Sequence, residues 1–181
     1  MALGDSLTAG LGLPLSDAYP AVLQRRLNAA GYRFEVVNAG VSGDTSAGGR
    51  SRFDWCLEGD VRVLVLALGG NDGLRGLPVT EMEGNLAAII ERAQQRHVQV
   101  LLAGMETLTN MGPQYQRAFH DVFPGLARRY RVAFLPFLLE GVAGRPDLNQ
   151  PDGIHPTAEG ARVIADHLFA VLEPLLRTAQ R

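Results

Sequence analysis

The sequence predicts an α/β protein, a three-layer α/β/α sandwich in which helices cover both faces of a parallel sheet. Short apolar runs alternate along the chain with segments of helical periodicity, the pattern of repeated βαβ units. The run Val63–Leu68 is apolar at every position, as in strands buried on both faces. With 181 residues, 46% of them hydrophobic, and no internal repeat or linker, the chain fits a single domain over 1–181.

Five short apolar segments are the strand candidates. They are Met1–Leu3, Phe34–Asn38, Val61–Leu68, Gln99–Ala103 and Ala133–Leu135. Only three residues precede the first polar motif of the chain. The sequence therefore indicates either that residues were trimmed from this end or that the first strand is unusually short.

Four segments with helical periodicity lie between or after these strands. They are Tyr19–Ala30, Thr80–Arg96, Gln114–Tyr130 and Thr157–Arg177. Gly31 suits the position just after the first of them, and Pro156 suits the start of the last. Pro124 lies inside the third, where we expect a kink or two separate helices.

The composition excludes several classes of function. The formal net charge is −2 and no run of Lys or Arg occurs, so a nucleic-acid footprint is not indicated. Cys56 is the only cysteine, which rules out an intramolecular disulfide and a cysteine-based metal site. No segment is apolar enough for stable membrane insertion, and no signal peptide is visible.

Two segments carry the residues of a nucleophile and its base. Ser6 follows the first strand within a Gly-Asp-Ser-Leu-Thr turn, where its hydroxyl could face a substrate. Asp152 precedes His155 by three residues, so its carboxylate can fold back onto Nδ1–H and leave Nε2 as a general base. Each segment alone has an ordinary structural explanation, a helix cap for Ser6 and a surface turn for the Asp152–His155 pair.

Two further segments could supply hydrogen-bond donors to an oxyanion. Gly43 would let a substrate oxygen approach its backbone N–H, and Asn71 follows a double glycine that could turn its amide into the crevice. A helix-capping loop, with Asp44 or Thr45 as the cap, and a plain turn explain these segments equally well. Ser42 is a rival nucleophile, but its surroundings lack the second glycine of a G-x-S-x-G elbow.

Taken together, the four segments contain the parts that acyl transfer requires. A serine hydroxyl needs a base, and the tetrahedral intermediate needs fixed donors. Each segment follows a predicted strand or precedes a predicted helix, and loops at the carboxyl ends of parallel strands are where α/β proteins bind ligands. No metal-ligand spacing is present, so we expect no metal site.

In order along the chain, these segments resemble the four sequence blocks of the SGNH hydrolases. They read GDSLTAG, VVNAGVSGDTSAGG, LGGNDGLRG and DGIHP, and they are most similar to the bacterial thioesterase I/protease I/lysophospholipase L1 subgroup, which includes arylesterases. The resemblance implies a flavodoxin-like, five-stranded parallel sheet, and it implies no cofactor. It also implies Ser6 as nucleophile, His155 as base and Asp152 as its orienting group. The implied oxyanion hole is the N–H of Ser6, the N–H of Gly43 and the side chain of Asn71.

The resemblance implies a serine esterase or thioesterase that acts on small aryl or acyl substrates through an acyl-enzyme. Many relatives are periplasmic, so we expect that compartment if a leader was removed and the cytoplasm otherwise; we also expect a monomer. Two segments that flank the crevice offer candidate substrate-binding residues: Leu74, Arg75, Leu77, Leu108 and Met111. The alternatives are a carbohydrate O-deacetylase or acyltransferase on the same fold, and a non-catalytic flavodoxin-like binding module.

Overall fold

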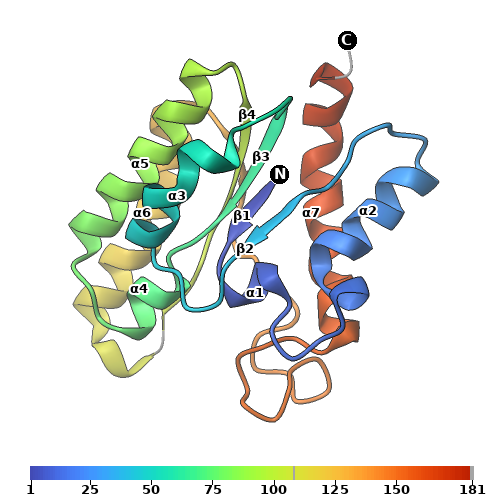
Figure 1. Ribbon diagram of the computed structural model, residues 1–181. Helices are drawn as coiled ribbons and strands as arrows, with labels where there is room; N and C mark the ends of the chain where they lie inside the picture. Colours follow the sequence, from blue (N-terminus) through green and yellow to red (C-terminus); the bar gives the residue numbers. More distant parts are fainter. Residues whose placement is uncertain (108, 180–181) are drawn as a thin grey trace.

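A computed structural model describes residues 1–107 and 109–179, and it contains the parallel sheet that the sequence predicts (Figure 1). The strands are β1 (Ala2–Gly4), β2 (Asn38–Gly40), β3 (Val63–Ala67), β4 (Gln99–Ala103) and β5 (Ala133–Leu135). All neighbours pair in parallel, in the order β2-β1-β3-β4-β5. This is the flavodoxin-like order, with a switch point between β1 and β3.

Helices cover both faces of this sheet. They are α1 (Ser6–Ala9), α2 (Tyr19–Ala29), α3 (Ser46–Cys56), α4 (Gly70–Leu74), α5 (Val79–Gln95), α6 (Pro113–Tyr130) and α7 (Ala158–Ala179), with short 3₁₀ turns at Leu15–Asp17 and Thr109–Met111. Helices α3, α5 and α6 lie on one face, and α2 and α7 lie on the other (Figure 1). Because both faces are covered, every residue of β3 is buried, which explains its uninterrupted apolar sequence.

The structure corrects two of the expected elements. The second strand is β2, Asn38–Gly40, and not Phe34–Asn38, because the side chain of Gln24 binds the backbone of Phe34 and Val36 in place of a neighbouring strand. The helix around Pro124 is a single element rather than two. Its proline lacks the N–H that would bind the carbonyl of His120, so the helix continues without that one hydrogen bond.

The register of the three strands on the β2 side of the sheet aligns their carboxyl ends. Gly4 of β1 pairs with Gly40 of β2 on one side and with Ala67 of β3 on the other. The loops that carry Ser6, Gly43 and Asn71 therefore leave the sheet at the same edge. This edge lies at the switch point, where the connections that follow β1 and β3 run to opposite faces of the sheet.

Candidate active site

Ser6 is the first residue of α1, in a turn that depends on the residues before it. Asp5 caps the helix, and its Oδ1 accepts a hydrogen bond from the N–H of Leu7 at 3.0 Å. A Cβ on Gly4 would lie 1.9 Å from Oγ1 of Thr8, so only glycine allows α1 to pack this closely onto β1. The strand therefore ends directly in a helix that presents Ser6 at the sheet edge.

His155 joins Ser6 to Asp152 by hydrogen bonds. The distance from Nε2 of His155 to Oγ of Ser6 is 3.0 Å, and Nδ1 lies 2.7 Å from Oδ2 of Asp152. Because a carboxylate only accepts hydrogen bonds, the proton of the neutral ring belongs on Nδ1, and Nε2 accepts from the serine hydroxyl. The three side chains thus form the relay that nucleophilic catalysis by serine requires.

Asp152 is held in its ionised form by its own loop. The N–H groups of Ile154 and His155 each donate to Oδ1 at 3.0 Å. The backbone bond from His155, the ring of His155 and the bond from Ile154, in that order, lower the pKa of Asp152 to about 2. A carboxylate is therefore available to orient the imidazole at any pH near neutrality.

The loop that carries His155 is fastened to the loop that carries Ser6. Nε2 of Gln150 donates to the carbonyl of Leu11 at 2.8 Å and to that of Pro156 at 2.9 Å. The backbone N–H of Gln150 also donates to the carbonyl of His155 at 2.7 Å. These contacts hold the imidazole beside α1, although Ser6 and His155 lie far apart in the sequence.

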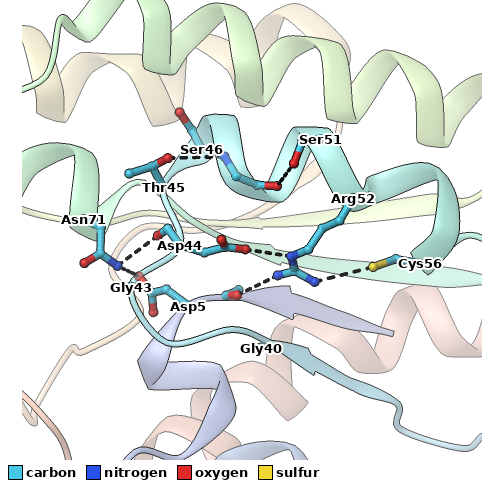
Figure 2. A network of polar contacts seen from close by, with 12 residues as sticks. Asp5, Gly40, Gly43, Asp44, Thr45, Ser46, Ser51, Arg52, Cys56 and Asn71 are labelled. Carbon is cyan, nitrogen blue, oxygen red and sulfur yellow. Dashed lines mark hydrogen bonds and ion pairs between the residues drawn. The ribbon is translucent and has the colours of Figure 1, made fainter.

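The candidate oxyanion donors surround the same point. Gly43 has a φ of +83°, a conformation that favours glycine, and its carbonyl accepts from the Arg75 side chain at 2.8 Å. Nδ2 of Asn71 donates to the carbonyl of Asp44 at 2.9 Å and to Oδ2 of Asp5 at 3.2 Å (Figure 2). The amide of Asn71 therefore connects the turn before Ser6 with the loop that contains Gly43.

A second contact fixes the helix that carries Asn71. Asp72 is 3% exposed, and its carboxylate accepts from both the N–H of Ser46 at 2.8 Å and the hydroxyl of Ser46 at 2.6 Å. Ser46 begins α3, and Thr45 caps that helix through a bond from the N–H of Gly48. Helices α3 and α4 are thus tied together beside the candidate donors.

A cavity of about 560 Å³ opens above Ser6 and His155. Of the predicted substrate-binding residues, Leu74 lines it. Arg75 is bound to the carbonyl of Gly43 at the rim, and Met111 lies over Gly76. Leu77 and Met111 are not among the described residues that line the cavity, and Leu108 lies outside the described residues.

Sequence reasoning missed one wall of this cavity. Phe137, Leu139 and Ala143 come from the segment after β5 and face the cavity together with Met105, which follows β4. The apolar residues that follow Pro136 could have indicated this wall, because apolar side chains at the carboxyl edge of a sheet are placed to line a ligand cavity. Ser42, the rival nucleophile, also lines the cavity, but Nε2 of His155 lies beside Ser6.

Three other features were considered as functional sites: a second cavity, a metal site and a membrane-spanning helix. A cavity of about 490 Å³ lies among Met1, Phe34 and Leu176, around the amino end of β1 and away from Ser6. Among residues 1–107 and 109–179, no three His, Cys, Asp or Glu side chains are grouped so that they could hold a metal ion. In the same residues, no helix is both long and apolar enough to cross a membrane.

Comparisons with known proteins identify the family of this chain. Residues 2–163 match the model of the GDSL-like Lipase/Acylhydrolase family. The chain is 42% identical to Esterase TesA of Pseudomonas aeruginosa, over 97% of this chain and 88% of the relative. It is 38% identical to Thioesterase 1/protease 1/lysophospholipase L1 of Escherichia coli, over 96% and 83% respectively.

A solved structure shows the same fold around the same core. The psychrotrophic esterase EstA from Pseudoalteromonas, in a form inhibited by monoethylphosphonate, matches with a TM-score of 0.92. It is 31% identical, and the match covers 97% of each chain. The resemblance seen in the four sequence blocks is therefore confirmed over nearly the whole chain, and the protein belongs to the GDSL-like lipase/acylhydrolase family, as a serine-dependent hydrolase of carboxylic ester or thioester bonds.

Proposed function

We propose that Ser6 is the nucleophile of this hydrolase, that His155 is its general base and that Asp152 orients the imidazole. Oγ of Ser6 attacks the substrate carbonyl carbon while Nε2 of His155 takes the hydroxyl proton. The imidazolium then gives that proton to the leaving alcohol or thiol, and the acyl group remains on Ser6. Water attacks the acyl-enzyme while Nε2 of His155 takes one of its protons, and His155 returns that proton to Oγ of Ser6 as the acid is released.

The proposed oxyanion hole consists of the N–H groups of Ser6 and Gly43 and the amide of Asn71. All three residues line the cavity beside His155. When the tetrahedral intermediate forms, Nδ2 of Asn71 would share the hydrogen that now reaches Oδ2 of Asp5 at 3.2 Å, its longer bond. Such donors act mainly on the charge that develops in the transition state, so they raise kcat more than they lower KM.

We further propose that the acyl chain lies against the apolar wall formed by Leu74, Met105, Phe137 and Leu139. These residues line the cavity that contains Ser6, and its volume accommodates a medium-length chain. Each methylene buried there contributes about 0.8 kcal/mol, or roughly a fourfold gain in affinity. Small aryl or acyl esters and thioesters with several carbons are therefore the proposed substrate class.

The observation that carries this proposal is the continuous Ser6–His155–Asp152 relay at the floor of an apolar cavity. The test is hydrolysis of p-nitrophenyl esters from acetyl to dodecanoyl by the wild type and by the Ser6→Ala and Phe137→Ala variants. We expect Ser6→Ala to abolish turnover and covalent labelling by a fluorophosphonate, with an unchanged circular dichroism spectrum. We expect Phe137→Ala to reduce kcat/KM for octanoyl esters while acetyl esters are unaffected.

Two results would contradict the proposal. Turnover by Ser6→Ala close to the wild-type rate would exclude Ser6 as the nucleophile. Equal losses for acetyl and octanoyl esters in Phe137→Ala would place the acyl chain elsewhere. A wild type that cleaves acetylated sugars but no p-nitrophenyl acyl ester would favour a carbohydrate deacetylase instead.

A further inference from the structure

We propose that Arg52 is a positioning residue that sets the distance between the turn before Ser6 and the loop that contains Gly43. Its Nε donates to Oδ2 of Asp44 at 2.7 Å, and one terminal nitrogen donates to the carbonyl of Gly4 at 3.1 Å (Figure 2). One guanidinium group therefore binds both loops from behind. This inference rests on the proposed function, because it assigns Arg52 a role in aligning those groups.

The guanidinium is largely buried, and each of its three nitrogens has a partner. The Arg52 side chain is 20% exposed and that of Asp44 is 16% exposed, unlike the ion pairs on the outer surface. The remaining terminal nitrogen lies 3.5 Å from Sγ of Cys56, one helical turn along α3. Three contacts in one plane use the fixed fork of an arginine, which a lysine ammonium cannot reproduce.

The backbone at Gly48 leaves room for the carboxylate of Asp44 beside Arg52. A Cβ on Gly48 would lie 2.5 Å from Oδ1 of Asp44, so a side chain there would push the carboxylate away. Gly48 is one turn before Arg52 on α3, and Thr45 caps the same helix through the N–H of Gly48. The start of α3 is therefore shaped to hold the carboxylate of Asp44 against the guanidinium of Arg52.

Both ends of the Arg52 contact lead toward the proposed oxyanion hole, through Asp44 to Asn71 and through Gly4 to the loop that contains Gly43. The carbonyl of Gly4, which accepts from Arg52, also accepts from the N–H of Val41 at 3.0 Å. Asp44, which Arg52 binds through its carboxylate, accepts from Nδ2 of Asn71 through its carbonyl. Loss of Arg52 would release the loop that aligns Asn71 and Gly43 with Oγ of Ser6.

Misalignment of the reacting groups in an active site lowers the catalytic rate by a large factor. A displacement of about 1 Å costs about 10²-fold, so we expect Arg52→Gln to lower kcat by about that factor, with KM changed less than about threefold. Arg52→Lys should recover only part of this loss, because an ammonium group can keep the bond to Asp44 but not the fork to Gly4. The substrate is p-nitrophenyl butyrate, and the readouts are kcat, KM and the thermal midpoint.

The matched control is Arg92→Gln. Arg92 also anchors α3 through an aspartate, with Nε of Arg92 2.8 Å from Oδ1 of Asp54, but this pair is exposed and far from the catalytic loops. If Arg52 aligns the site, Arg92→Gln retains wild-type kcat while Arg52→Gln loses it. If Arg52 only stabilises the fold, Arg52→Gln lowers the thermal midpoint and leaves kcat within about twofold of the wild type, which overturns the inference; the exposed Arg92 pair contributes little to stability, so Arg92→Gln should change the midpoint less.

Two further results separate the possible failures. If Arg52→Gln does not fold, Arg52→Lys and Asp44→Asn supply the same comparison, and wild-type kcat in both of them also overturns the inference. Ser6→Ala is measured in parallel, because residual turnover there would refute the proposed nucleophile rather than the role of Arg52. Loss of turnover in Ser6→Ala, with wild-type kcat in Arg52→Gln, refutes only the positioning role.

Discussion

Asp5 lies directly before Ser6 and is 2% exposed, so its replacement by asparagine tests how the site holds a buried carboxyl group. Burial raises the pKa of Asp5 from its ordinary 3.8 to about 6. The bond from Leu7, the nearby charge of His155 and the bond from Asn71 oppose this shift, but they do not cancel it. The folded protein therefore binds the Asp5 proton more tightly than the unfolded chain does.

The sign of the effect on stability follows from that difference. The contribution of Asp5 to stability is complete below pH 3.8 and is lost as the pH rises through about 6. Each pKa unit is worth about 1.4 kcal/mol, so the whole loss is about 3 kcal/mol. About a third of this loss of stability occurs below about pH 4.5. The remaining loss, roughly 2 kcal/mol, occurs between about pH 4.5 and pH 8.

Asp5→Asn removes the charge and keeps one of the two acceptors. Its Oδ1 can still cap Leu7, while the loss of the bond from Asn71 costs about 1 kcal/mol at every pH. The free energy of unfolding is measured by urea titration for both proteins at pH 4.5 and pH 8. Relative to the wild type, we expect the variant to gain about 2 kcal/mol between the two pH values.

The comparison is controlled within the same chain. Asp121→Asn changes an exposed aspartate on α6 and should not reproduce the gain. A difference between Asp5→Asn and wild type that stays constant within about 0.5 kcal/mol would refute the reasoning, since burial would then not control the charge of Asp5.

Two further changes test the catalytic groups directly. Asp152→Asn should lower kcat by as much as about 10⁴-fold with the fold retained, because the amide stabilises the wrong imidazole tautomer; esterase assays with a circular dichroism control check this, and near-normal kcat would exclude the orienting role. Asn71→Ala should lower kcat by about 10²–10³-fold with little change in KM. A change confined to KM would make Asn71 a ground-state binding residue.

Much of the fold could be predicted because apolar pattern and burial coincide in this chain. The bounds expected for β4 and β5 match the structure, and the expected core strand contains all of β3. The β2 segment could not be located by pattern, because Phe34–Val37 is as apolar as a strand but binds the Gln24 side chain. That contact depends on the packing of α2, which the local sequence does not contain.

The residues of the candidate site likewise include some that could be predicted from the sequence and some that could not. Ser6, Gly43 and Asn71 follow strands whose carboxyl ends are aligned, so their approach could be predicted from the parallel sheet alone. Phe137 and Leu139 reach the cavity from beyond β5, at the far edge of the sheet, and no sequence spacing relates them to Ser6. Residues that a loop brings to the cavity from a distant strand can be identified only from the three-dimensional structure.

Three poorly exposed carboxylates surround the proposed oxyanion hole, and their partners explain why they are tolerated. Asp72 is bound by two donors of Ser46, Asp44 by the guanidinium of Arg52, and Asp5 by the N–H of Leu7 and the amide of Asn71. Burying a charge is costly unless it is paired or hydrogen-bonded, and an apolar core gives stability without that cost. These carboxylates instead fix positions, because each holds a backbone segment or an amide group at the edge of the sheet where the oxyanion would form. Burial raises the pKa of Asp5 in spite of its hydrogen bonds, so at Asp5 the need for alignment acts against stability.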